Sequence, residues 1–309
     1  MDSFTKAQAA LPGLQVWEIG ERNEKGRYLY TGNRVFFGTL EVSLKSANLG
    51  MPAMQVTFLR FLICGLVLLP AAITSIRKRK VRLTKGDLAY LTLLGFICIT
   101  CSMTVYQVGL NYCNANTAAT ILCINPAFTM VFAHFLTEDK FNRKKMVVLG
   151  LSIAGLVFVA NPVNMAEGNT PLGILLVLFG AVAFGLFTAL GKRRVDRIGS
   201  MAQNSFGFLL GCVIQLFILL FAKVPVFEGV TLANLPWILY LGVVVTGFGY
   251  ICLVKGIETA GPSQASVAFF LKPIVSLIAA ALFLGEAVTW NIVVGIAFIS
   301  GGFLYSYKK

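Results

Sequence analysis

A lysine stands in the middle of a long apolar run near the C-terminus. Lys272 lies in VAFFLKPIVSLIAAALFLG, about ten residues from either end of a span predicted over 262–284, so its ammonium group cannot easily reach water. A charge at the membrane midplane costs at least ~2.5 kcal/mol on insertion scales. We favour a substrate or proton site for this lysine; the alternative is an ion pair that only ties helices together.

Prolines are predicted to interrupt two helices at related places. Pro273 follows Lys272 directly, and it should kink its helix because it removes a backbone donor and frees the carbonyl group of Phe269. Asn125 and Pro126 form the same kind of pair in LCINPAFTM. Two broken helices with polar groups at the break predict a binding site near the membrane midplane.

Glu41 is the candidate counter-ion for Lys272, but the sequence offers this acid three partners. Lys45 follows it by one helical turn, and Arg60 is predicted at a similar depth in the next span. A Glu41–Arg60 pair near the outer face would be structural only. Pairing with Arg60, Lys45 or Lys272 therefore stays open at this point.

Other polar residues in the apolar runs give weaker signals. Tyr106 and Gln107 are candidates to line the cavity, although tyrosines also anchor helices at the membrane interface. His134, the only histidine, is expected near the cytoplasmic end of its helix, where packing is a more common role than proton relay. GLFTALGK has five residues between its glycines, so it is no phosphate loop. Without catalytic or metal-ligand motifs, we expect no enzyme activity, cofactor or metal.

The composition places these residues in a membrane protein. Of the 309 residues, 57% are hydrophobic and 13% are charged, and the mean hydropathy is +0.79. The net charge of +13 comes from short basic clusters between apolar runs, which indicates loop orientation rather than a nucleic-acid partner. Seven cysteines within or beside these runs, and the GFLLG motif at 207–211, predict close helix packing rather than disulfides.

Nine apolar runs are long enough to span a bilayer, and a tenth is doubtful. The nine are predicted at 54–76, 88–110, 115–137, 144–162, 171–191, 203–222, 234–256, 262–284 and 289–307, and the doubtful one at 28–45. Counted with the doubtful span, the second, fourth and sixth loops carry the basic clusters and are predicted to be cytoplasmic. We expect an all-α integral protein of the cell membrane, with ten transmembrane helices and both termini cytoplasmic.

One offset relates the two halves of the chain. Lys45 and Lys192 lie 147 positions apart, and the same offset joins two predicted cap threonines and the two mid-helix prolines. The further pairs are Thr84 with Thr231, Gly95 with Gly242, Pro126 with Pro273 and Gly155 with Gly302. Five helices per half is an odd number, so we expect two inverted five-helix repeats, at 36–162 and 163–309, as in secondary transporters.

The N-terminal segment matches its counterpart in the second half only in part. FFGTLEVSLK, which ends at Lys45, keeps the register, but the preceding EKGRYLYTGNRV stands where the second half has PLGILLVLFGAV. Arg34 would lie near mid-membrane at a further cost of ~2.5 to 3.5 kcal/mol. Residues 1–35 are thus an atypical polar segment. They either complete a short, strained first helix or, as we favour, are foreign sequence from a frameshift or misplaced start.

Several segments resemble the EamA family of the drug/metabolite transporter superfamily. They are FGTLEVSLKS, QVTFLRFLICGLVLLP, NTAATILCINPAFTMVFAHFLTED and, in the second half, GPSQASVAFFLKPIVSLIAAALFLGEAVTW. The resemblance implies ten helices in two inverted repeats and alternating access around a central cavity. It also implies small metabolites or toxic compounds as substrates, commonly moved outward. The matched positions are Arg60, Pro126, Pro273 and Glu286, whereas Glu138-Asp139 replaces a common Gly-Glu pair.

Together these features predict a secondary transporter that exports a small metabolite, such as an amino acid or a toxic compound. Lys272 and the two broken helices would form its site, in contact with a small-molecule substrate inside the lipid bilayer. A proton or solute gradient would supply any energy, because the chain contains no ATP-binding motif. The alternative is a non-transporting membrane receptor or assembly scaffold, which predicts no substrate-dependent flux.

Overall fold

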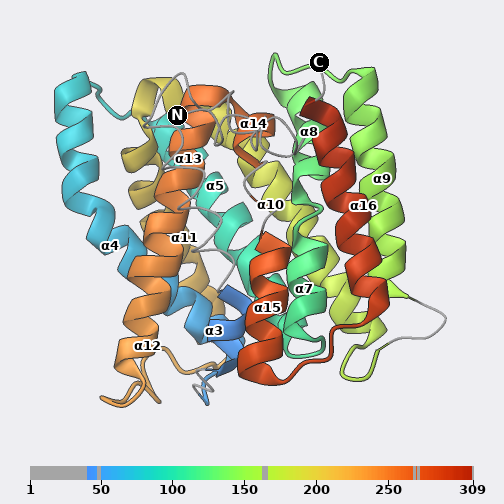
Figure 1. Cartoon of the computed structure of the whole chain (residues 1–309). Helices are drawn as coiled ribbons and strands as arrows, with labels where there is room; N and C mark the ends of the chain where they lie inside the picture. Colours follow the sequence, from blue (N-terminus) through green and yellow to red (C-terminus); the bar gives the residue numbers. More distant parts are fainter. Residues whose placement is uncertain (1–39, 47–49, 162–165, 267–268, 270–271, 308–309) are drawn as a thin grey trace, which may run out of the picture.

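The computed structural model describes residues 40–46, 50–161, 166–266, 269 and 272–307. Every regular element within these ranges is a helix (Figure 1). The doubtful span at 28–45 is described only from residue 40 onward, and the segment 1–35 lies outside the described residues.

The helices of the first half follow the predicted spans. A short helix, α3, precedes α4, and the next span runs from α5 through the π-helical segment η2 into α6. The fourth span is divided into α7 and α8, and α9 closes the half. The bounds are Leu40–Ser46 (α3), Ala53–Arg79 (α4), Lys85–Gly95 (α5), Phe96–Thr104 (η2), Val105–Leu110 (α6), Ala115–Leu122 (α7), Asn125–Leu136 (α8) and Arg143–Ala160 (α9).

The second half has the same order of elements. Its third span again contains a π-helical segment, η3, and its fourth span is again divided, into α14 and α15. The bounds are Pro171–Ile198 (α10), Ser200–Phe221 (α11), Leu235–Leu239 (α12), Tyr240–Phe248 (η3), Gly249–Ala260 (α13), Pro262–Ser266 (α14), Lys272–Leu284 (α15) and Trp290–Tyr307 (α16). Each predicted span from residue 54 onward thus coincides with one helix or a run of consecutive helices.

Length and apolar composition identify the membrane-crossing helices. In the described part of the chain six helical runs are long and apolar enough to cross a bilayer: 53–79, 85–110, 115–136, 171–198, 200–221 and 235–259. The helices α15 and α16 are shorter but also apolar. Large apolar side chains such as Phe217 and Phe221 remain exposed, as expected for helices that face lipid. The protein is an all-helical, multi-pass membrane protein.

Reciprocal hydrogen bonds occur at equivalent positions of the two halves. Those at Thr84 form the N-cap of α5, whereas those at Thr231 close a turn before α12, whose N-cap residue is Asn234. The backbone N–H of Asp87 donates to the Thr84 hydroxyl at 3.2 Å, and the Thr84 N–H donates to the Asp87 carboxylate at 2.9 Å. In the second half the Asn234 N–H donates to the Thr231 hydroxyl at 3.3 Å, and the Thr231 N–H donates to Asn234 Oδ1 at 2.8 Å. Each pair satisfies two backbone donors at the start of the third span.

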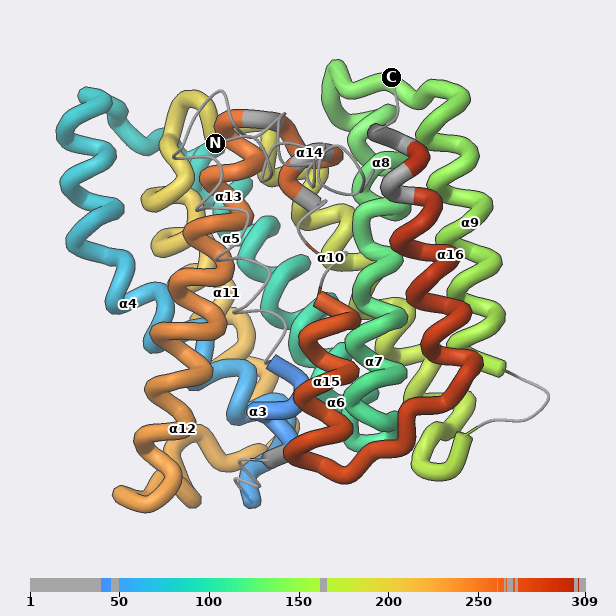
Figure 2. Tube along the Cα trace, viewed as in Figure 1, coloured from blue at the N-terminus to red at the C-terminus, as the bar shows by residue number. Residues whose placement is uncertain are grey.

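Equivalent helices of the two halves pack side by side. The helix α4 lies against α11, and α9 lies against α16, as Figures 1 and 2 show. Between α9 and α16, a Cβ atom on Gly155 would lie 2.8 Å from the carbonyl oxygen of Gly295. A close backbone approach of this kind is typical of small residues in membrane helices.

The GFLLG motif packs in the same way. A Cβ atom on Gly95 of α5 would lie 2.0 Å from the carbonyl oxygen of Gly207 and 2.8 Å from the Cα atom of Gly211, both in α11. These are backbone atoms of a helix, which cannot rotate away as a side chain can. The prediction that this motif mediates close helix packing is therefore confirmed.

Gly95→Ala should lower the stability of the protein by ~1–3 kcal/mol, since α5 and α11 must separate to admit one methyl group. The matched control is Gly150→Ala in α9, where a Cβ atom meets nothing within 4 Å. Heating each variant in detergent and measuring the monodisperse fraction would compare the two. If Gly95→Ala and Gly150→Ala lost monodispersity at the same midpoint temperature, the contact between α5 and α11 would not be tight.

Candidate functional site

Glu41 and Lys272 meet inside the bundle. The Nζ atom of Lys272 lies 2.5 Å from Glu41 Oε1, and both side chains are 0% exposed. Glu41 stands in the first turn of α3 and Lys272 is the first residue of α15. Of the three partners that the sequence left open for Glu41, the structure therefore brings Lys272 to it.

Tyr106 reaches the same carboxylate from α6. Its hydroxyl group donates to Glu41 Oε1 at 2.5 Å, and its ring centroid lies 5.8 Å from Lys272 Nζ. One oxygen of Glu41 thus accepts from two donors, while Oε2 has no hydrogen-bond partner among the described residues. A buried carboxylate oxygen without a hydrogen-bond donor is energetically unfavourable.

The two divided helices border the ion pair. The helix α7 ends at Leu122, and α8 begins at Asn125 with Pro126 in its first turn. The corresponding helix in the second half begins at Lys272, with Pro273 next to it. Asn125 and Lys272 lie 147 positions apart, so the two breaks present a neutral amide and a cation at equivalent places. Packing of α15 against both α3 and α7 brings these elements together.

Two more buried polar groups at these breaks lack a partner within the described residues. The side-chain oxygen of Asn125 accepts a hydrogen bond from the Thr129 hydroxyl at 3.0 Å. The side-chain Nδ2 group of Asn125 donates to none of the described residues. Ser276, one turn after Lys272, also has an unpartnered hydroxyl group. Both side chains are 0% exposed. Sequence reasoning missed Ser276, although its spacing of four from Lys272 was the available signal.

Arg60 lies near the pair without joining it. Its side chain is buried in α4, its guanidinium carbon is 5.5 Å from the Phe61 ring centroid, and its Nε has no hydrogen-bond partner in the described part of the chain. No ion pair connects Arg60 to Glu41 among these residues, so the structural pair considered from the sequence is replaced by Glu41–Lys272. Arg60 remains within electrostatic range of Glu41 and adds positive potential there.

Gln107 faces a separate cavity. Its side-chain oxygen accepts from the Thr57 hydroxyl at 2.7 Å. The cavity has a volume of about 520 Å³ and is lined by Leu44, Lys45, Gly50, Met51, Pro52, Ala53, Val56, Gln107, Leu110 and Asn111. Lys45 and Gln107 follow Glu41 and Tyr106 closely in the sequence, so the cavity lies beside the elements that hold the ion pair.

His134 has a local role. Its Nδ1 atom accepts the backbone N–H of Phe141 at 3.1 Å, just after the end of α8, and its ring lies edge-on to Phe135 and Phe141. These contacts fix the turn between α8 and α9. They agree with the interpretation of His134 as a packing and hydrogen-bonding residue.

A bundle of apolar helices around a fully buried ion pair at two helix breaks defines a class, the multi-pass membrane transporters. The sequence profile of the EamA-like transporter family matches residues 28–161 and again residues 171–307. The chain belongs to the EamA-like transporter family. The first match begins at residue 28, inside the segment 1–35, and the division of the chain at 36–162 and 163–309 stays a prediction.

Known relatives agree with this assignment. A Clostridium kluyveri protein described as an uncharacterized transporter is 34% identical over 292 residues, which are 93% of this chain and 94% of that protein. The uncharacterized transporter YoaV of Bacillus subtilis is 25% identical over 89% of this chain and 96% of its own length. A solved crystal structure has the same fold, with a TM-score of 0.68 at 16% identity over 92% of this chain and 97% of that one.

Proposed function

We propose that the protein exports a small zwitterionic metabolite of the amino-acid type by alternating access around the Glu41–Lys272 pair. The observation that carries the proposal is a fully buried ion pair whose acid keeps one oxygen without a hydrogen-bond partner among the described residues. Buried charges are costly unless each has a partner, so any solute that opens this pair must supply both signs of charge.

A zwitterion meets that requirement. Its carboxylate would take the place of Glu41 at Lys272, and its ammonium group would contact Glu41 Oε2. The exchange keeps the interior neutral, whereas an anion or a cation alone would leave one buried charge without a partner. Asn125 Nδ2 and Ser276 Oγ, which donate to none of the residues that the structure describes, would contribute hydrogen bonds to the same carboxylate.

The architecture that we propose is ten helices in two inverted five-helix repeats. Support comes from the two consecutive family matches, the equivalent reciprocal hydrogen bonds, the paired π-helical segments and the two divided fourth spans. An inverted repeat places the binding groups at the interface of the two halves and gives both faces access in turn. The basic clusters of the even-numbered loops support a cytoplasmic location for both termini in the cell membrane.

Proton coupling is a second possibility, and Glu41 is the group that would support it. A proton on Oε2 would neutralise the acid, weaken its attraction for Lys272 and so couple proton movement to the release of the lysine. An export cycle driven by protons would use the same residues as one driven by the solute gradient alone.

Flux measurements test the proposal. Purified protein in liposomes loaded with a panel of labelled amino acids and small metabolites should release at least one of them faster than protein-free liposomes. Repeating the assay with an imposed pH gradient should change the rate if protons are coupled. A receptor or scaffold would give no flux above the protein-free control for any member of the panel.

A further inference from the structure

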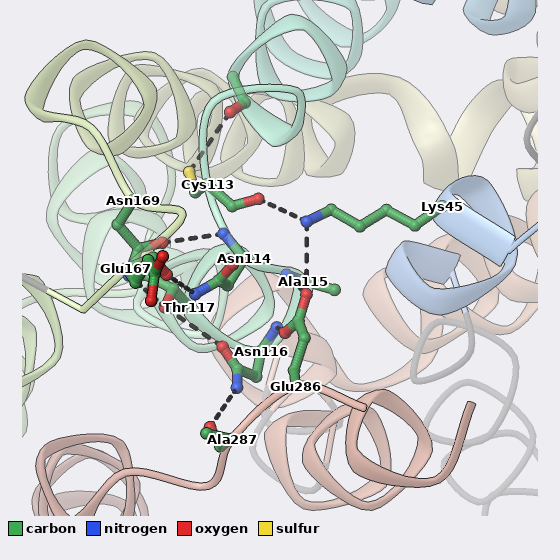
Figure 3. A network of polar contacts seen from close by, with 11 residues as sticks. Lys45, Cys113, Asn114, Ala115, Asn116, Thr117, Glu167, Asn169, Glu286 and Ala287 are labelled. Carbon is green, nitrogen blue, oxygen red and sulfur yellow. Dashed lines mark hydrogen bonds and ion pairs between the residues drawn. The ribbon is translucent and has the colours of Figure 1, made fainter. Parts of the chain in front are cut away.

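A second polar cluster joins three elements at one end of the bundle. The Glu286 carboxylate, just after α15, accepts the backbone N–H groups of Ala115 at 2.7 Å and Asn116 at 3.0 Å, at the start of α7 (Figure 3). Lys45, near the end of α3, contacts the same carboxylate at 3.3 Å and donates to the carbonyl oxygen of Cys113 at 2.7 Å. We call these five residues the Glu286 clasp.

The Glu286 clasp holds the same elements that carry the central ion pair. Lys45 lies one helical turn after Glu41 on α3, and Glu286 follows the helix α15 that begins with Lys272. The helix α7, which the clasp caps, leads into the break before Asn125. These contacts tie α3, α7 and the chain after α15 together at this end of the bundle.

The offset of 147 residues gives three residues of the Glu286 clasp polar counterparts in the opposite half of the chain. Positions 147 residues away carry the same kinds of group. They are an acid after the divided helix, a polar residue at the start of the opposite divided helix, and a lysine in the first helix, which in the second half continues to Ile198. These counterparts are Asp139 for Glu286, Ser263 for Asn116 and Lys192 for Lys45. We call them the Asp139 set.

The Asp139 set is joined only in part. Asp139 accepts from the Ser263 hydroxyl and forms an ion pair with Lys145. Lys192 instead pairs with Asp196 at 3.0 Å and donates to the backbone oxygen of Glu258 at 3.3 Å. No ion pair between Lys192 and Asp139 occurs within the described residues. The lysine-to-acid contact that is closed in the Glu286 clasp is therefore open in its counterpart.

We propose that Lys45–Glu286 and Lys192–Asp139 are alternative gate contacts, each of which forms as the other breaks. The inference rests on the proposed function, because it requires two inverted repeats that exchange conformations during transport. After such an exchange the second half has the conformation that the first half has here, so Lys192 meets Asp139 and Lys45 leaves Glu286. Lys45 and Glu286 act as positioning residues that set which side is open.

Cross-linking can detect an approach of positions 139 and 192, which form no ion pair in this structure. Asp139→Cys and Lys192→Cys would be combined with Cys101→Ser and Cys252→Ser, since the other five native cysteines are buried. A short bis-maleimide would then join positions 139 and 192 only when they approach, and mass spectrometry would give the yield. Into this variant we would introduce Glu286→Gln or Lys45→Met, each of which removes the charge contact of the clasp.

Either change should raise the cross-link yield by roughly 5- to 10-fold, because it removes the ion pair that favours the present state. Lys45→Met leaves Glu286 on the amides of α7, so it remains informative if Glu286→Gln does not fold. The control is Glu228→Gln, the same loss of charge outside the clasp, which should leave the yield unchanged.

Two readouts separate this inference from the proposed function. An unchanged yield in correctly inserted Lys45→Met protein overturns the gate contacts, even where flux shows that a zwitterion is transported. A raised yield supports the gate contacts, and a lack of flux for every solute in liposomes with the unmodified protein would then reject zwitterion export alone.

Discussion

Lys272→Met should abolish transport while the protein still inserts into the membrane. Methionine keeps most of the length of the side chain but removes the charge that would bind the carboxylate of the substrate. The change also leaves Glu41 buried opposite an apolar group, which costs about 3–5 kcal/mol unless the acid takes up a proton. Flux in proteoliposomes, normalised to the amount of inserted protein, would measure the loss.

The control for this variant is Lys223→Met, which removes a lysine that is exposed after α11. We expect its flux to equal that of the unmodified protein. Full transport by Lys272→Met would remove the lysine from the mechanism and leave the ion pair as a structural tie.

The double variant Glu41→Gln with Lys272→Met should recover stability but not transport. Both buried charges disappear together, so the penalty of about 3–5 kcal/mol for a single unpaired charge is avoided. Tyr106 keeps a hydrogen-bond acceptor in the amide oxygen of the new glutamine. Thermal unfolding in detergent should place the double variant well above either single variant, and proteoliposome flux should remain at the protein-free level.

This variant separates the two roles that a buried ion pair can have. If the pair only ties α3 to α15, a stable neutral replacement should transport as well as the unmodified protein. A stable double variant with substantial flux would therefore contradict the site that we propose.

Much of the fold follows from simple properties of the sequence. Apolar runs of about twenty residues located the spans from residue 54 onward, since length and composition alone decide whether a helix suits a bilayer. The prediction that Thr84 caps the helix after it is confirmed, with Asp87 returning the hydrogen bond. The same prediction for Thr231 was wrong, because α12 begins only after Asn234. The π-helical segments at 96–104 and 240–248 were not predicted, because these spans are apolar at most positions and so show no clear periodicity that a shift from i−4 to i−5 bonding could change.

The site was predicted in its residues but not in its contacts. Lys272 was conspicuous as a charge far from water, whereas the choice among Lys45, Arg60 and Lys272 for Glu41 depends on how α3 and α15 pack across 231 residues of sequence. The contacts of Glu286 could not be predicted either, since they use backbone N–H groups that a sequence does not distinguish.

The central claim is that the buried pair recognises both charges of a zwitterion, and competition measures this most directly. For any amino acid that the protein transports, flux would be measured against the carboxylic acid without the amino group and the amine without the carboxylate. We expect the zwitterion to compete and both single-charge analogues to compete at least tenfold more weakly, since each leaves one buried charge without a partner. Equal competition by the acid or by the amine would contradict the account.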